Sequence, residues 1–402
     1  MSSFKKFIEE KPLYYKEIDH ERVHIAYAML KPHIKKPMVI HIVGTNGKGS
    51  TGRIMATLLH LAGYDVGHFS SPHILKFNER IWLNGEDSSD EILEEAHTRL
   101  YTILGQEVCE GLSYFEYTTL LSFVVMEELD VIILEAGLGG EFDATNVVDK
   151  ELSVITPIGI DHQAFLGDNI ESIATTKLNS IDKKAIIGFQ QSDEVERIAR
   201  KISQERGTEL YFLKDMLNSL ESETLVPNKT RLKPLVKKDL ESKILPLTEE
   251  MGWSGYLYEN TLLAISALDI LGLNYDIESL REVKLFGRFY QFLPNVIIDV
   301  GHNLLASEAI VKTLKAKNQK VVLIYNTLDD KDYISILKVF APVIKWVEVI
   351  PISTARAVDI DILYKNLKKL SITYKKFNSI KDENSYLVFG SFYVVEAFIK
   401  KN

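Results

Sequence analysis

The segment His41-Ile-Val-Gly-Thr-Asn-Gly-Lys-Gly-Ser-Thr51 decides the fold of this 402-residue chain. Residues 37–43 form an apolar, β-branched run that predicts a strand, and the residues after the loop carry apolar side chains at helical spacing as far as Ala62. The helix N-terminus and Lys48 supply positive charge. Three loop glycines, Gly44, Gly47 and Gly49, allow the backbone to bend so that several N–H groups point inward. The segment therefore predicts a cradle for a polyphosphate, with an ordinary glycine-rich turn as the alternative.

The composition excludes several classes of protein. The net charge of −9 leaves no basic excess for nucleic-acid binding, and no run of about 18 apolar residues predicts a membrane span. The first residues lack the apolar core of a secretory signal. Cys109 is the single cysteine, so an internal disulfide and a cysteine-cluster metal site are both excluded. We expect a cytoplasmic, monomeric protein with no nucleic-acid or membrane partner.

The loop departs from the common GxxxxGK[ST] pattern, because Gly49 separates Lys48 from Ser50. In this form it resembles the phosphate loop of the Mur-ligase superfamily, specifically that of bacterial bifunctional folylpolyglutamate synthase/dihydrofolate synthase. Further segments resemble that family in the same order: Ser70-Ser-Pro-His73 with Asn78-Glu-Arg80, Ser113-Tyr-Phe-Glu-Tyr-Thr-Thr119, Gly137-Leu-Gly-Gly140 with Asp143-Ala-Thr-Asn146, Phe286-Gly-Arg-Phe289 and Asp299-Val-Gly-His-Asn303.

The resemblance implies an α/β fold of two domains. Residues 1–284 would form a P-loop ATPase-like Mur-ligase domain that binds ATP, and residues 285–402 a smaller Rossmann-like glutamate ligase domain. The alternation of strand and helix patterns after residue 320 independently predicts a parallel sheet in the second domain. That domain lacks GxGxxG, so the sequence does not support dinucleotide binding.

The nucleotide-binding residues follow from the resemblance. They would be Thr45, Asn46, Gly47, Lys48, Gly49 and Ser50 of the loop, with Asn260 at adenine and with Arg288 and Asp299 of the second domain.

Three predicted strands end on groups able to ligate a metal: Ser71, Glu135 and His162. The resemblance implies two Mg²⁺ sites, the first held by Ser71 and Glu135 and the second by His162 and an N6-carboxylated Lys177. Lys48, His162, Lys177 and His302 would be the catalytic residues. The plainer explanations are serines that cap a turn, a structural histidine and an exposed lysine.

The substrate-binding residues also come from the resemblance. They are Ser113, Phe115, Phe142, Asp143 and Ala144 on the pterin side, and His302 and Ser391 on the glutamate side. Core packing is an equally good explanation for Phe115. The chain departs from the family at Glu141, where relatives have arginine, and at Leu178-Asn179, where they have Ala-Gly.

The implied reaction joins L-glutamate to dihydropteroate, to reduced folates, or to both. The γ-phosphate of ATP would pass to the acceptor carboxylate, and the glutamate amine would displace phosphate from the acyl phosphate. A muropeptide ligase is disfavoured, because only about 40 residues precede the loop and a UDP-binding domain needs about 100. The sequence is also compatible with a nucleotide-dependent switch protein and with an inactive relative of the family.

Overall fold

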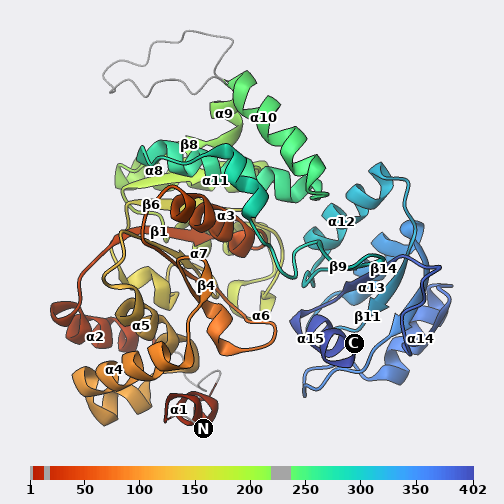
Figure 1. Cartoon of the computed structure of the whole chain (residues 1–402), viewed down its shortest axis with the longest axis horizontal. Helices are drawn as coiled ribbons and strands as arrows, with labels where there is room; N and C mark the ends of the chain where they lie inside the picture. The colour runs from red at the N-terminus through yellow and green to blue at the C-terminus, as the bar shows by residue number, and fades with distance from the viewer. Residues whose placement is uncertain (1–2, 13–18, 219–236) are drawn as a thin grey trace. The chain divides into compact units, whose positions relative to one another are not determined.

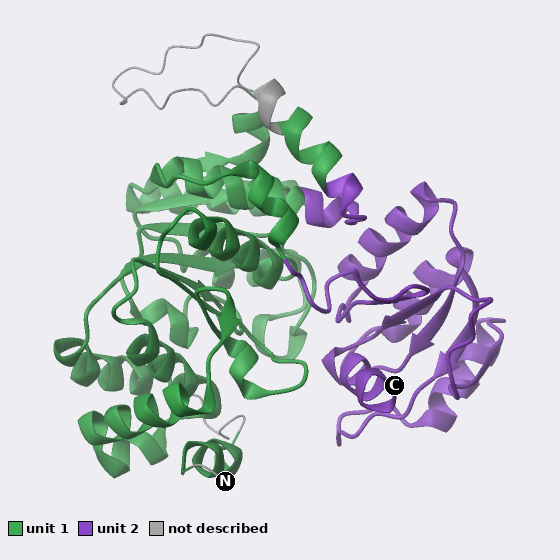
Figure 2. Ribbon diagram, viewed as in Figure 1, with its two compact units in different colours: residues 1–247, 259–283 green, residues 248–258, 284–402 purple. Residues whose placement is uncertain are grey.

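The computed structural model describes residues 3–12, 19–218 and 237–402, and the chain divides into two compact units (Figures 1 and 2). Unit 1 comprises residues 1–247 and 259–283, and unit 2 comprises residues 248–258 and 284–402. The segment 248–258 therefore groups with the second unit, although it precedes residue 285 in the chain. One helix, α11 (Gly255–Leu271), begins in unit 2 and continues in unit 1.

Unit 1 is built on an eight-stranded sheet in its described part, in the order β4-β3-β2-β5-β1-β6-β7-β8. Neighbouring strands pair in parallel, except that β3 is antiparallel to both β2 and β4. The strands are β1 (Met38–Val43), β2 (Val66–Phe69), β3 (Ile81–Leu83), β4 (Glu86–Asp87), β5 (Val131–Glu135), β6 (Leu152–Ile155), β7 (Lys184–Ile187) and β8 (Glu209–Phe212).

The α-helices of the described residues around this sheet are α1 (Ser3–Glu10), α2 (Glu21–Leu30), α3 (Lys48–Leu61), α4 (Asp90–Gly111), α5 (Tyr114–Met126), α6 (Gln163–Leu166), α7 (Ile170–Leu178), α8 (Asp193–Arg206), α9 (Leu213–Asn218), α10 (Lys237–Glu250) and α11. Short 3₁₀ helices are η1 (Lys31–His33), η2 (Phe77–Arg80), η3 (Ala144–Val147) and η4 (Ile277–Glu282). Helices α1, α2, α4 and α5 share one core with β1, β2, β3 and β5, and α7 and α8 share another with β6 and β7.

Among the described residues, unit 2 contains a six-stranded sheet in the order β13-β12-β11-β14-β10-β9. Its strands are β9 (Tyr290–Leu293), β10 (Val296–Ile298), β11 (Val321–Tyr325), β12 (Ile344–Val349), β13 (Tyr374–Lys376) and β14 (Tyr386–Phe389). Its helices after residue 284 are α12 (Leu304–Ala316), α13 (Tyr333–Phe340), η5 (Ala341–Val343), α14 (Ile360–Lys369) and α15 (Phe392–Lys401).

The sequence pattern predicted the central strands well and the sheet edges poorly. The mixed α/β architecture with mostly parallel sheets is confirmed. The expectation of a parallel second sheet misses β9, which pairs antiparallel to β10 at the edge. Strand β6 ends at Ile155, two residues before Pro157, a residue without a backbone N–H to continue the ladder.

Lys11 is a buried lysine that holds the end of α4. Its Nζ donates to the carbonyl oxygens of Cys109 (2.6 Å) and Leu112 (2.7 Å), and it lies 4.6 Å from the centre of the Phe7 ring. A cation is favourable at a helix C-terminus. Burial nevertheless lowers the pKa of Lys11 from 10.5 to about 8, so desolvation outweighs these contacts.

This pKa sets a pH dependence of stability. Between pH 8 and 10.5 the unfolded chain keeps a proton on Lys11 that the folded chain has released, so the free energy of unfolding rises with pH in this window. We expect the free energy of unfolding of wild type, relative to that of Lys11→Met, to rise by about 2–3 kcal/mol from pH 8 to 10.5. Urea unfolding of both proteins measures it, and a constant or shrinking difference would contradict the assignment.

Candidate active site

The glycine loop connects β1 to α3 and is fixed by backbone bonds to the loop after β6. The N–H groups of Thr45 and Asn46 donate to the Pro157 carbonyl at 2.9 and 3.2 Å, and Thr45 Oγ1 donates to the Gly159 carbonyl at 3.1 Å. The first helical bond of α3 runs from the Thr51 N–H to the Gly47 carbonyl (2.9 Å). The N–H groups from Lys48 to Ser50 therefore precede the helical ladder, which is the arrangement that binds anions.

Two lysine side chains meet at one carbonyl oxygen of this loop. Lys48 Nζ and Lys177 Nζ lie 3.2 and 2.9 Å from the oxygen of Gly44. Lys177 comes from the end of α7, and its side chain is buried, with 5% of the residue exposed. Burial and, to a smaller extent, the charge of Lys48 lower the pKa of Lys177 to about 7. A neutral amine is therefore available at physiological pH beside the phosphate loop.

Glu135 ends β5 beside Lys48. One carboxylate oxygen lies 3.9 Å from Lys48 Nζ, and the other accepts a hydrogen bond from the Ser71 N–H at 3.3 Å. Ser71 follows β2, the neighbouring parallel strand, and precedes Pro72 through a cis peptide bond. The sequence prediction that Ser71 and Glu135 lie together at one sheet edge agrees with this geometry.

His162 lies in the turn that precedes α6. It has a left-handed backbone with φ of 52°, and its N–H donates to Asp161 Oδ1 at 2.8 Å. A histidine with positive φ is uncommon and indicates a position fixed by its surroundings. The charge of Asp161 raises the pKa of Lys177, so this turn lies within electrostatic range of Lys177.

The residues present fit a magnesium ion only if serine and phosphate oxygens share in its coordination. Glu135 and Ser71 offer the hard oxygen atoms that Mg²⁺ prefers, but the described ranges contain no group of three His, Cys, Asp or Glu able to hold a metal. Magnesium commonly binds through one or two carboxylates together with substrate phosphates. Glu135 and Ser71 are therefore the ligands expected for a magnesium ion that binds together with a nucleotide.

The segment expected on the pterin side forms a tightly hydrogen-bonded loop. Asp143 is buried; its Oδ2 accepts from the Leu138 N–H (2.8 Å) and its Oδ1 from the Thr145 hydroxyl (2.6 Å). Burial raises its pKa. Ala144 is buried, whereas Phe142 is 54% exposed and stacks on the His20 ring, with centroids 4.2 Å apart. Of the three residues, Phe142 presents an open aromatic surface.

The side chains of Ser113 and Phe115 have structural contacts at the start of α5. Ser113 is the N-cap, with its hydroxyl accepting from the Glu116 N–H and its own N–H donating to the Glu116 carboxylate. The Phe115 ring lies against Gly137, where an added Cβ would come within 2.6 Å of the ring. Gly137 therefore permits the glycine-rich segment after β5 to pass directly over this ring.

In unit 2, the residues singled out from the sequence gather at the carboxyl ends of β10 and β14. Asp299 follows β10, and its carboxylate accepts from the Gly301 N–H (2.7 Å) and the Phe289 N–H (2.8 Å). His302 Nδ1 lies 3.1 Å from the Val300 carbonyl, and the Arg288 guanidinium lies over the Phe392 ring. Ser391 follows β14 and caps α15.

Sequence reasoning missed Tyr256 in the first turn of α11. Its hydroxyl donates to Asp299 Oδ2 at 2.6 Å, so it completes the ring of donors around that carboxylate. One helical turn later, Asn260 Nδ2 donates to Ser50 Oγ at 2.8 Å, which places it against the phosphate loop. The spacing of four residues, which puts both side chains on one helix face, was the available signal.

Position 47 does not tolerate a side chain, for two reasons. Its φ is +86°, and an added Cβ would lie 2.7 Å from Asn260 Oδ1. We expect Gly47→Ala to weaken ATP binding at least about tenfold, measured by titration calorimetry, because the loop N–H groups would move. Gly63→Ala is the matched control, since Gly63 has φ of +95° and no atom within 4 Å of its Cβ position. Equal losses of affinity in the two variants would contradict this account.

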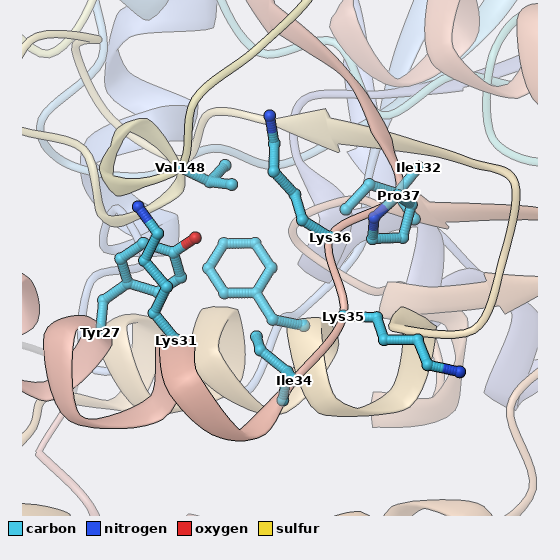
Figure 3. A pocket seen from close by; sticks show the side chains of 9 residues that line it. Tyr27, Lys31, Ile34, Lys35, Lys36, Pro37, Ile132 and Val148 are labelled. Atoms are coloured by element: carbon cyan, nitrogen blue, oxygen red, sulfur yellow. The ribbon is translucent and has the colours of Figure 1, made fainter.

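A cavity near the amino ends of β1 and β5 lies away from the phosphate loop and lacks the free charged groups of a catalytic site (Figure 3). Its apolar wall includes Phe123, Ile132 and Val148, and three lysines surround it. Each lysine is already paired with a carboxylate: Lys31 with Asp149 (3.8 Å), Lys35 with Glu128 (2.5 Å) and Lys36 with Glu151 (3.2 Å). We therefore assign no anionic ligand to it.

None of the described helices is both long and apolar enough to cross a membrane.

Comparison with known proteins gives consistent matches over the whole length. No protein-family model matches the chain. The dihydrofolate synthase/folylpolyglutamate synthase of Escherichia coli K12 is 32% identical over 423 residues, covering 98% of this chain and 94% of that protein. The structure of E. coli FolC in complex with DHPP and ADP matches with a TM-score of 0.78 at 29% identity, covering 99% of this chain and 96% of that one. The bifunctional enzyme of Yersinia pestis complexed with AMPPNP and Mn ion matches with a TM-score of 0.78 at 25% identity, covering 99% and 97%.

Proposed function

Because this chain belongs to the dihydrofolate synthase/folylpolyglutamate synthase family, we propose that its site carries out both reactions of that name. The enzyme is an ATP-dependent ligase that joins glutamate to folates. The proposal adds that it accepts dihydropteroate, forming dihydrofolate, as well as tetrahydrofolate, to which it adds further glutamates. The observation that carries it is the pair of lysines at the Gly44 carbonyl, of which Lys177 is buried and Lys48 lies beside Glu135.

We assign nucleotide binding to unit 1. The N–H groups at the start of α3 and the Lys48 ammonium bind the triphosphate of ATP, and Asn260 holds Ser50 in the loop. Arg288 and Asp299 of unit 2 are proposed to contact the nucleotide as well. Glu135, Ser71, His162 and a carboxylated Lys177 would hold two Mg²⁺ ions, which neutralise charge on the phosphate oxygens when bound.

Lys177 is proposed to be carboxylated. Its neutral amine adds CO₂, a new N–C bond forms, and one proton leaves to solvent, which yields a carbamate anion. The pKa of about 7 supports this step, because an ordinary lysine amine with pKa 10.5 is almost wholly protonated at neutral pH.

The substrates are placed by the remaining side chains. Phe142 offers an aromatic face for the pterin, with Ser113, Phe115, Asp143 and Ala144 shaping that region. His302 and Ser391 of unit 2 are proposed to orient L-glutamate. Its amine then attacks the acyl phosphate, the amide bond forms, and phosphate leaves.

The test is ADP release by the purified protein with Mg-ATP and L-glutamate. Stimulation by dihydropteroate with formation of dihydrofolate supports the synthase reaction, and stimulation by tetrahydrofolate supports polyglutamylation. If only tetrahydrofolate stimulates turnover, the bifunctional assignment is wrong and the enzyme is a folylpolyglutamate synthase alone. If neither acceptor stimulates ADP release, the proposed acceptors are wrong. The proposal also includes a monomeric, cytoplasmic enzyme, and light scattering tests its oligomeric state.

A further inference from the structure

Glu141 and Asn179 join the segment after β5 to the end of α7. Asn179 Nδ2 donates to Glu141 Oε2 at 2.8 Å, across 38 residues of sequence. On its other side, Asn179 accepts from Arg206 of α8: Nη2 lies 3.3 Å from Oδ1, and Nη1 lies 2.7 Å from the Asn179 carbonyl. The amide therefore directs its donor at a carboxylate and its acceptor at a guanidinium, so its orientation is fixed from both sides.

Lys150 is linked to the backbone of Glu141 through Asn146. Asn146 Nδ2 donates to the Glu141 carbonyl at 2.9 Å, and Lys150 Nζ donates to Asn146 Oδ1. Burial and the nearby charge of Arg206 both lower the pKa of Lys150, to about 8. Asn146 therefore holds the backbone of Glu141, while Asn179 holds its carboxylate.

The same two segments also touch at the backbone, directly beside Lys177. The Glu141 N–H donates to the Thr176 carbonyl at 2.9 Å, and a Cβ on Gly140 would lie 2.6 Å from the Lys177 carbonyl oxygen. Asn179 caps the C-terminus of α7, two residues after Lys177. The position of this helix end determines whether Lys177 Nζ reaches the Gly44 oxygen, which it does at 2.9 Å.

We propose that Glu141 is a positioning residue for the ligase reaction: through Asn179 it fixes the end of α7 and so holds the Lys177 amine at the phosphate loop. The catalytic part of this inference rests on the function proposed above. Two of the positions at which the sequence departs from the family motifs, Glu141 and Asn179, are thus hydrogen-bonded to each other.

The experiment compares Glu141→Leu, Glu141→Gln, Asn179→Ala and the double variant Glu141→Leu/Asn179→Ala in the full chain. Glu171→Leu is the matched control, because Glu171 lies on the same helix with 68% of its side chain exposed. Three quantities are measured: kcat and KM for ATP in acceptor-dependent ADP release, Tm, and the rate at which acetic anhydride labels Lys177 in CO₂-depleted buffer. Lys184, with 41% of its side chain exposed, is the internal reference for labelling.

We expect Glu141→Leu to lower kcat about tenfold, the usual effect of removing a group that orients an active-site side chain. Lys177 should become several times more reactive relative to Lys184, because its amine is no longer held in place. Glu141→Gln, which keeps the acceptor for Asn179, should stay within about threefold of wild type in kcat. The double variant should be no worse than the worse single variant, since both remove one contact. Glu171→Leu should change none of these quantities.

The proposal is overturned if Glu141→Leu changes Tm but leaves kcat and Lys177 labelling at wild-type values, which is the result of a purely structural role. Multiplicative losses in the double variant would also overturn it, because the two side chains would then act independently. If wild type itself shows no acceptor-dependent ADP release, the proposed function fails. The labelling rates of the single and double variants then still decide whether Glu141 and Asn179 position Lys177.

Discussion

Replacing Lys48 by alanine is expected to lower kcat/KM for ATP by about a thousandfold. Lys48 is 14% exposed at its side chain and lies between the Gly44 carbonyl and Glu135, so water cannot easily replace its charge. A cation in this position stabilises the charge on the phosphoryl group during transfer. Steady-state ADP release at varied ATP concentration measures the loss.

Two controls accompany this variant. Lys36→Ala removes a lysine near the start of β1 that pairs with Glu151 at 3.2 Å, and it should leave kcat/KM unchanged. Lys48→Arg keeps the charge but not the compact ammonium, so it should recover only part of the activity. A loss of less than about tenfold in Lys48→Ala, with an unchanged Tm, would mean that the lysine is not at the transferring phosphate.

Replacing Lys177 by alanine is expected to lower kcat by at least about a hundredfold, because the proposed carbamate and its metal-binding oxygens are lost. A carbonyl ¹³C signal of a carbamate should appear when wild type is incubated with ¹³C-bicarbonate and should be absent from Lys177→Ala. With a pKa of about 7, the neutral fraction of the amine rises from about a tenth at pH 6 to about nine-tenths at pH 8. CO₂ uptake should therefore increase over this range.

Lys177→Glu serves as the control, because a carboxylate on a shorter chain is expected to restore part of the activity without any dependence on bicarbonate. Wild-type activity that is independent of CO₂ throughout, with no carbamate signal, would contradict the modification. Loss of activity in Lys177→Ala would then have to come from the amine itself.

The centre of the site could be predicted from the sequence because its residues are neighbours in the chain or lie at the ends of adjacent strands. In the loop from Gly44 to Ser50, the glycines themselves indicate the backbone conformation, because Gly44 and Gly47 have positive φ. Ser71 follows β2 and Glu135 ends β5, and these two strands are paired in the sheet, so recognising two parallel strands was enough to bring the residues together.

Contacts between distant side chains could not be predicted in this way. Tyr256 meets Asp299 across 43 residues, and its four-residue spacing from Asn260 indicates a shared helix face but not this partner. Asp143 remains a proposed pterin-side residue, but the sequence did not indicate that both of its carboxylate oxygens accept hydrogen bonds from its own loop. The sequence showed Glu141 and Asn179 as two separate departures, and only the folded chain shows them as one pair.

The burial of Cys109 makes the enzyme well suited to site-specific fluorescent labelling. The single thiol is 0% exposed, and burial raises its pKa to about 11, so it is almost entirely the unreactive thiol at neutral pH. Cysteines introduced at Ile25 of α2 and Ile362 of α14, which are 59% and 52% exposed, would accept maleimide dyes without removal of the native residue.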